Sequence, residues 1–443
     1  MKQQLGRVLA WLSAVAAVVL LGVALDAVPS VTPEPPARVE FAARDLAQPV
    51  PDHAAPKKAP SDAGAPRPEP LKVWSFPVCE APEKGARVYG LALGASQAAF
   101  VWCKGGYTRL DLSSVGELPQ AQRGARFPSR AELPGGVTAH DFDADGVLDL
   151  VLATAPPPQV LHRPGAGAFL LRGRMAGGFE PARALVEAPV SAVAGLEVEG
   201  TGAAALAVLT RGDLTAQRPG ELWLFAGGTS LTRVAQQPLG LGARDLVTAR
   251  LMGSGRSLWA ALPQAGKLAG VEFLAASGKL AWGPLQSVAF PAVQGLIGKG
   301  AGEPSSLLLA RDTADVRRLE AQADALALTP WAEHVNVGPG LLVDLDGDSQ
   351  PEVLAVVDGG VARVFPSLRS APEELDLPAH ALDVASVRDQ TARERALVLV
   401  RESDTGWLSL LLLPSPPWSQ GSQVELQRLE VADAAGQAVV ALD

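Results

Sequence analysis

Two short acidic stretches of this 443-residue chain have the composition and spacing of metal sites. The first reads DFDADGVLDL and the second DLDGDSQPEV. Each places carboxylates at positions 1, 3, 5 and 9, which are Asp141, Asp143, Asp145 and Asp149 in the first stretch and Asp344, Asp346, Asp348 and Glu352 in the second. Two carboxylates about 5 Å apart repel by roughly 3 kcal/mol at an effective dielectric constant of about 20. A loop that gathers four of them therefore predicts a bound hard cation, and Ca²⁺, with its all-oxygen shell, fits best.

Position 7 of each stretch adds a backbone carbonyl to the predicted ligands, from Val147 and from Gln350. Positions 1, 3 and 5 also suit an EF-hand, but position 12, which should be Glu, is Leu152 in one stretch and Ala355 in the other. The flanking segments LDLVLAT and EVLAVV are typical of strands, not helices. The residues thus favour two strand-loop-strand calcium sites. Acidic surface turns without metal remain the alternative, above all for the second stretch, which lacks Gly at position 6.

The elements around these loops recur along the chain. From Leu71 onward, short runs rich in Val, Leu and Ala are bounded by Gly, Pro and Asp, as in strands and turns. A strand, a tight loop and a very apolar strand repeat about every 42 to 56 residues, starting at Gly90, His140, Leu196, Ala249, Leu296, Val343 and Ala385. Seven four-stranded sheets packed face to face around an axis would cover every apolar face. The sequence therefore predicts an all-β fold, a seven-bladed β-propeller; an irregular sandwich or two barrels is the alternative.

Two segments compete to close the predicted ring. LKVWSFPVC, which begins at Leu71, precedes the first blade and would serve as an outer strand of the last one. AVVALD at the carboxyl end would suit the same place. The segment VELQRLEV, which begins at Val424, is expected to be a polar strand of the last blade. The residues do not decide between the two closures.

The acidic loops resemble the FG-GAP and VCBS repeats of integrin-α-like propellers. The family pattern D-x-[DN]-x-D-G-x-x-D-L is matched from Asp141 to Leu150, and the following GAGAFLLRGRMAGGF is similar to the family's Gly-rich segment. The resemblance is strong over two blades, weak over five, and covers residues 71–443. It implies a seven-bladed propeller with Ca²⁺ in blade loops, serving adhesion, ligand binding or scaffolding outside the cytoplasm.

The other loops depart from this pattern. The third blade has Glu197 and Glu199 at positions 1 and 3, but Thr201 and Ala205 at positions 5 and 9. The loops of the first, fourth and fifth blades are rich in Gly, Ser and Lys and cannot neutralise a divalent ion. About two Ca²⁺ ions are therefore predicted, not seven.

The amino terminus has the pattern of an export signal. Lys2 and Arg7 precede a long uncharged run, so residues 1–25 are expected to form a hydrophobic helix, either a signal peptide or a single-pass membrane anchor. Residues 26–70 are rich in Pro and Ala and predict a disordered linker. Both alternatives export the propeller of residues 71–443 to the periplasm or the cell surface, anchored or secreted.

The two cysteines, Cys79 and Cys103, lie in neighbouring predicted strands. In an exported protein they would form a disulfide worth about 3 kcal/mol. Two buried thiols are the alternative.

Binding, not catalysis, is the predicted function. The formal charge is -9 and no basic, aromatic-interleaved cluster occurs, which argues against nucleic acid. G-x-S-x-G, H-E-x-x-H and P-loop motifs are absent. We expect a non-catalytic propeller that binds a protein or glycan ligand in the cell envelope, for adhesion or scaffolding. A lectin-like propeller is the alternative, and a propeller enzyme, a polysaccharide lyase or a quinoprotein, is the third candidate.

Overall fold

The structure is a computed structural model. It describes residues 70–442 except 94–95, 116–117, 158–165, 214–215, 252–254, 277, 300–306, 313–314, 323–324, 333–336, 349, 358–359, 366–372, 389–392, 419–423 and 434–438. The predicted hydrophobic helix (1–25) and the predicted linker (26–70), except Pro70, lie outside the described residues. Within the described part of the chain, no helix is both long and apolar enough to cross a membrane.

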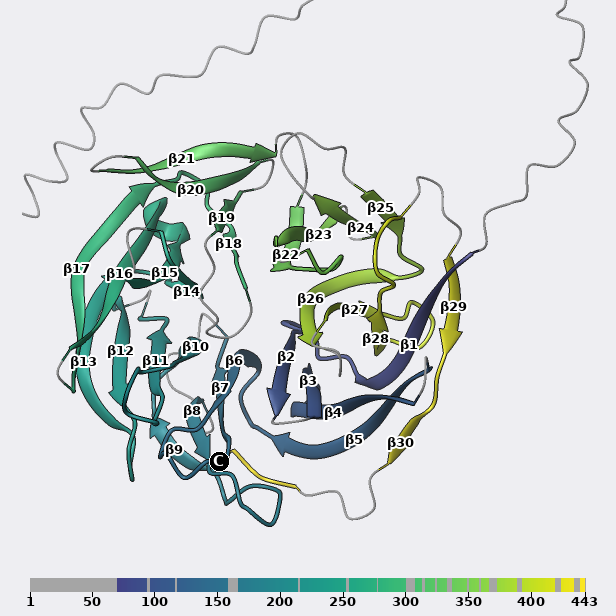
Figure 1. Ribbon diagram of the computed structural model, residues 1–443, viewed down its shortest axis with the longest axis horizontal. Helices are drawn as coiled ribbons and strands as arrows, with labels where there is room; N and C mark the ends of the chain where they lie inside the picture. The colour runs from purple at the N-terminus through teal and green to yellow at the C-terminus, as the bar shows by residue number, and fades with distance from the viewer. Residues whose placement is uncertain are drawn as a thin grey trace, which may run out of the picture. The chain divides into compact units, whose positions relative to one another are not determined.

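The described residues form seven sheets arranged in a ring, each sheet being one blade (Figure 1). Blade 1 contains β2 (Val88–Leu93), β3 (Ser96–Cys103), β4 (Gly106–Val115) and β5 (Leu118–Pro128). Blade 2 contains β6 (Leu133–His140), β7 (Asp149–Ala155), β8 (Gly167–Leu171) and β9 (Arg183–Val186). Blade 3 contains β10 (Val190–Leu196), β11 (Ala205–Thr210), β12 (Gly220–Ala226) and β13 (Thr232–Gly240). Blade 4 contains β14 (Arg244–Ala249), β15 (Arg256–Leu262), β16 (Lys267–Ala276) and β17 (Lys279–Ala289), with a 3₁₀ turn η1 (Pro263–Ala265) between β15 and β16.

Blade 5 contains β18 (Gly295–Ile297), β19 (Leu308–Arg311), β20 (Val316–Gln322) and β21 (Ala325–Ala332). Blade 6 contains β22 (Val337–Val343), β23 (Glu352–Val357), β24 (Val361–Phe365) and β25 (Glu373–Asp376). Blade 7 contains β26 (His380–Arg388), β27 (Glu394–Arg401), β28 (Trp407–Leu412) and, from the start of the chain, β1 (Leu71–Glu80). The predicted seven-bladed β-propeller is confirmed. Each of the seven recurrent units begins inside the innermost strand of a blade or at its last residue, and continues into the second strand.

The second strand of each blade is the most apolar, because neighbouring blades pack against both of its faces. Every residue of β7, β11 and β23 is buried. The fourth strand lies at the rim and is more polar; in β13, exposed and half-buried residues alternate from Val234 to Pro238, and only Leu239 is buried. The core lies between blades, as where Val151 and Leu170 of blade 2 meet Val208 and Phe225 of blade 3. Burial between neighbours is what makes seven marginal sheets one stable ring.

The ring is closed by the first strand. β1 pairs antiparallel with β28, so that Trp74 lies opposite Leu412, and LKVWSFPVC is the fourth strand of blade 7. AVVALD does not take this place. VELQRLEV is not an antiparallel strand of the blade either: β29 (Val424–Arg428) runs parallel to β1 on its outer side, with Leu71 opposite Val424. The sequence shows that this segment is polar, but only the closed ring shows which edge remains for it.

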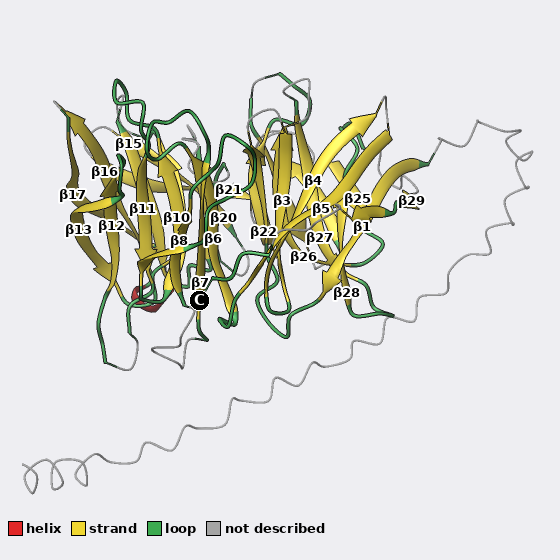
Figure 2. Cartoon of the chain, turned by 90° about the horizontal axis from the view of Figure 1, so that it is seen from below, coloured by secondary structure: helices red, strands yellow, loops and turns green. Residues whose placement is uncertain are grey.

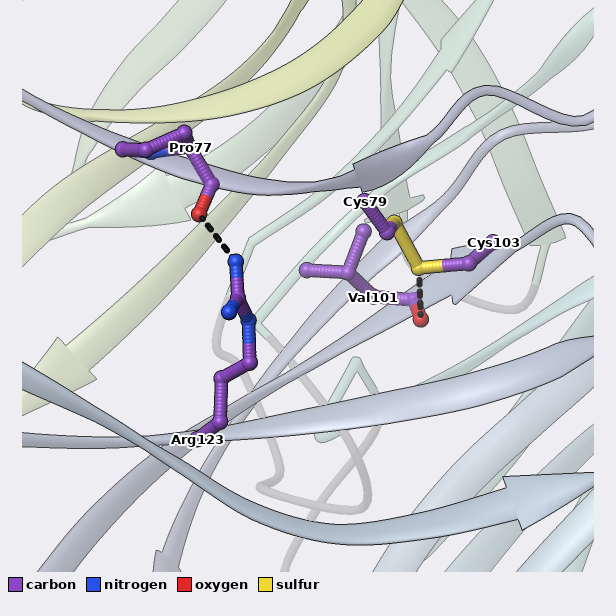
Figure 3. Close-up of a disulfide and its surroundings, with 5 residues drawn as sticks. All are labelled: Pro77, Cys79, Val101, Cys103 and Arg123. Atoms are coloured by element: carbon purple, nitrogen blue, oxygen red, sulfur yellow. Dashed lines mark hydrogen bonds between the residues drawn. A yellow bond between two sulfur atoms is a disulfide. The ribbon is translucent and has the colours of Figure 1, made fainter. Parts of the chain in front are cut away.

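A disulfide spans the closure between blades 7 and 1. The structure joins Cys79 on β1 to Cys103 at the end of β3, with their Cα atoms 6.0 Å apart (Figure 3). Beside the disulfide, the Arg123 guanidinium of β5 donates to the Pro77 carbonyl of β1 at 3.5 Å and pairs with Asp433 at 2.9 Å. Of the two states open to the cysteines, the disulfide is the one present.

The carboxyl-terminal segment runs along the rim of blade 1. β30 (Val431–Asp433) lies parallel to β5, and the Val440 and Leu442 amides donate to the Arg126 and Pro128 carbonyls, each at 3.0 Å. Leu442 is fully buried in the cluster that contains Trp102 and Phe127. Figure 2 shows the strands of the blades standing side by side in the ring.

Replacing Leu442 with Ala is expected to lower the free energy of unfolding by about 2 to 4 kcal/mol, because the lost side chain leaves a cavity against Trp102 and Phe127. Urea titration followed by tryptophan fluorescence measures the change. Val439→Ala is the control, since Val439 is 67% exposed. Equal effects of the two substitutions would show that the end of the chain does not contribute to the core.

Candidate metal sites

Both acidic loops occupy the same place in their blades. Each connects the innermost strand to the second strand, from β6 to β7 in blade 2 and from β22 to β23 in blade 6. Position 9, Asp149 or Glu352, is the first residue of the second strand and is buried. Because all innermost strands lead into equivalent turns around the ring, both loops lie on the face of the ring where the innermost strands end.

The second loop brings together all four predicted carboxylates. Asp344, Asp346, Asp348 and Glu352 each offer an oxygen within 4.8 Å of the others. Backbone amides hold them there: Gly347 donates to Asp344 Oδ1 at 2.7 Å, and Leu345 to Glu352 Oε2 at 2.8 Å. The first three side chains are partly or fully exposed, so an ion can reach them from solvent. Four convergent oxygens of this kind suit a hard divalent cation.

The first loop gathers three carboxylates. Asp141, Asp143 and Asp149 offer oxygens within 4.8 Å of one another, and Asp145 is outside this group. Asp145 Oδ1 accepts the Val147 amide at 2.8 Å, just as Asp348 Oδ1 accepts the Gln350 amide at 2.6 Å in the second loop. The carbonyls of Val147 and Gln350 as ligands stay a prediction.

An arginine distinguishes the first loop from the second. Arg172, just after β8, places Nη1 2.6 Å from Asp143 Oδ2. Asp143 Oδ1 is buried, and within the described residues nothing donates to it. The guanidinium thus supplies positive charge at the position where a cation would sit. Sequence reasoning missed Arg172, although it stands in the Gly-rich segment that follows the loop.

Arg172→Gln is expected to tighten calcium binding at the first loop about tenfold, because an ion no longer has to displace a charged hydrogen bond from Asp143. Calorimetric titration of a chain that also carries Asp346→Asn isolates this loop. Arg174→Gln is the control, since Arg174 lies exposed on the same turn. Unchanged or weaker binding in Arg172→Gln would mean that the guanidinium does not compete with the ion.

The backbone at position 4 explains how the second loop turns without Gly at position 6. Ala144 and Gly347, both at position 4, have φ of 62° and 83°. Both therefore lie in the left-handed region, which glycine adopts without strain. The first loop has a second such residue, Gly146, at φ 82°. The second loop thus has its glycine at position 4, two residues before the position at which the sequence pattern expects it.

Burial makes position 9 reluctant to ionise without a metal. Desolvation raises the pKa of Asp149 to about 6, although the Gly173 and Phe142 amides donate to it. Desolvation likewise raises the pKa of Glu352 to about 7, against the opposing effect of the Leu345 amide, and the Asp346 charge adds to the rise. A cation at these loops would offset that penalty.

Without metal, the protein is expected to lose stability as pH rises from about 4.5 through about 7. The folded-state pKa of Glu352 lies above its unfolded value of 4.5, so the folded state retains a proton that the unfolded state has released. Glu352→Gln should remove about 2 kcal/mol of this dependence. Thermal unfolding in chelator at pH 5 and pH 8 measures it. A variant with the same pH dependence as the wild type would contradict the assignment.

The turn of blade 3 is built differently. Glu197 is paired with Arg256 at 3.3 Å, and the Thr201 hydroxyl donates to backbone carbonyls of its own turn. Within the described residues, Glu197 and Glu199 belong to no group with metal-binding geometry. Two acidic clusters that could hold a metal ion agree with the expected number of sites.

His140 lies half-buried against Gly195 of the next blade, and burial lowers its pKa.

The comparisons with known proteins show the fold. No family model matches the chain, and no curated protein matches it in sequence. Among solved structures, two crystals of BBS1N in complex with ARL6DN, soaked with lead or mercury, are similar at TM-scores of 0.52 and 0.50. Both are 12% identical, covering 80% of this chain and 98% of theirs. A chain of a humanized mutant of the Chaetomium thermophilum Polycomb Repressive Complex 2 is 7% identical, with a TM-score of 0.50, covering 79% of this chain and 97% of that one.

Proposed function

We propose that this chain is an exported, non-catalytic, calcium-binding propeller of the FG-GAP/VCBS type, which binds a protein ligand in the cell envelope. The observation that carries the proposal is the convergence of acidic side chains in equivalent turns of blades 2 and 6. Carboxylates at strand-loop-strand positions suit an ion that stiffens the rim of the channel. The ions would pin blade turns and present a rigid surface to a partner.

Export is supported by the disulfide between Cys79 and Cys103, because such bonds persist in oxidising compartments. The periplasm or the cell surface is therefore the proposed location, with residues 1–25 as signal peptide or anchor. Protein binding is supported by the fold, since BBS1N, a similar structure, was solved in complex with ARL6DN. A propeller offers a broad rigid face with no need of a catalytic group.

Calorimetric titration of the full chain with Ca²⁺ tests the metal part of the proposal. Wild type should bind about two ions, and a chain with Asp143→Ala and Asp346→Ala should bind none. A pull-down from an envelope fraction, with and without chelator, tests the partner. Absence of calcium binding in wild type, or unchanged binding in the double variant, rules out the metal sites; identical partner recovery in chelator rules out a calcium-dependent binding surface.

A glycan ligand is the second candidate, supported by one side chain. Trp407 at the start of β28 is 40% exposed, and an exposed indole can stack on a sugar ring. Glycan-array binding that is lost in Trp407→Ala would favour this function over protein binding. If the wild-type chain retains no glycan on the array, this function is excluded.

A further inference from the structure

The face of the ring opposite the acidic loops carries a cluster of basic side chains. Lys84, Arg87, Arg311 and Arg401, which we call the basic mouth, line a cavity of about 370 Å³ together with Glu83. Arg311 lies opposite Gly295, at the start of β18, and Arg401 opposite His380, at the start of β26. Arg87 directly precedes β2. Blades 1, 5 and 7 thus bring their cations together where the innermost strands begin.

Arg87 is anchored at one end and open at the other. Its Nη1 lies 3.1 Å from Asp383 Oδ1, and Asp383 Oδ2 accepts the Val88 amide at 2.9 Å. The Asp383 side chain is only 7% exposed, whereas the Arg87 side chain is 45% exposed. A guanidinium that lines the cavity, is held by a buried carboxylate and is still nearly half exposed is pre-organised for a second acceptor.

Arg311 and Arg401 are positioned by neutral groups. Arg311 Nη1 donates to the Val337 carbonyl at 3.1 Å, and Arg401 Nη2 to the Pro82 carbonyl at 2.9 Å. Within the described residues, neither arginine forms an ion pair, and the Nε of Arg401 is buried with no acceptor. Burial lowers the pKa of Arg311, the Asp245 and Asp383 carboxylates raise it, and the Arg87 and Arg244 charges lower it. These charges repel one another, in a chain whose net charge is -9.

We propose that the basic mouth binds an oxyanion, the carboxylate or phosphate group of a ligand, between Arg87, Arg311 and Arg401. Guanidinium forks match the paired oxygens of such groups, and each charge-assisted hydrogen bond is stronger than a neutral one. Lys84, an exposed residue of the same lining, adds a further positive charge, and Glu83 moderates the attraction. The site lies on the opposite face of the ring from the metal loops and does not depend on calcium.

The test is calorimetric titration of the full chain at low ionic strength with two probes, inorganic phosphate and citrate. Saturable one-to-one binding is expected, and the tighter probe identifies the preferred oxyanion. Arg311→Gln should weaken binding about tenfold or more, because it removes a charged donor. Glu83→Gln, an exposed change that spares the fold, should tighten it about threefold. Arg87 is left unchanged, because its loss would strand the buried Asp383 carboxylate.

Lys104→Gln is the matched control, since Lys104 pairs with Glu80 outside this cavity and is 66% exposed. It should leave binding unchanged. The proposal is overturned if neither probe binds saturably, or if Arg311→Gln and Glu83→Gln behave like Lys104→Gln. Chelator should not affect the result, so failure here is distinguishable from failure of the calcium sites.

Discussion

Calcium is expected to raise the free energy of unfolding by about 5 kcal/mol when the free ion exceeds the dissociation constant of both loops one-hundredfold. The reason is the repulsion and desolvation stored at positions 1, 3 and 9 of each loop, which the ion relieves. Asp346→Asn should remove about half of the gain, because it disables the second loop. Differential scanning calorimetry with Ca²⁺ and with chelator measures both numbers.

The matched control for this experiment is Glu199→Gln. Glu199 is an exposed acid in the equivalent turn of blade 3, outside both metal-type groups. It should respond to calcium as the wild type does. A calcium effect that is equally small in all three proteins would contradict binding at the loops, and one that is lost equally in Glu199→Gln and Asp346→Asn would point to non-specific charge screening.

Loss of the disulfide is expected to lower the free energy of unfolding by about 3 to 4 kcal/mol. The bond closes a segment with a sequence separation of 24 residues, and it joins β1 to β3 where the ring closes. Without it, the first strand can detach from blade 1 while still paired with β28. Urea unfolding of the wild type and of a Cys79→Ser, Cys103→Ser double variant measures the loss.

Reductant supplies the internal check on that result. It should destabilise the wild type to the level of the double variant and leave the double variant unchanged. Equal sensitivity of the two proteins to reductant would mean that the effect does not arise from this bond.

Much of the fold could be predicted because its strongest signal is local. The second strand of every blade is buried on both faces, so segments such as DLVLATA and ALAVLT are apolar throughout and easily found in the sequence. Closure could not be predicted in this way. LKVWSFPVC and AVVALD have similar local patterns, and the pairing of Trp74 with Leu412 depends on the curvature of the whole ring.

The candidate sites also differ in whether their residues lie close together in the sequence. The carboxylates of each loop lie within nine residues, so their spacing was visible in the sequence and the structure brings most of them together. Arg172 was not visible, because a β-hairpin has to fold before it reaches Asp143. No local sequence pattern indicates the basic mouth. Arg87, Arg311 and Arg401 lie far apart in the chain and line one cavity only when three blades have come together.

The strand order at the closure also has a consequence for biosynthesis. β1 is made before every other described strand, but β28, its antiparallel partner, is made only after blades 1 to 6. During translation the two edges of β1 therefore have no sheet to join, which is a hazard for an apolar strand. Cys79 and Cys103, in contrast, are made close together. Once oxidised, they would hold β1 beside blade 1 and keep it in place for the last blade to arrive.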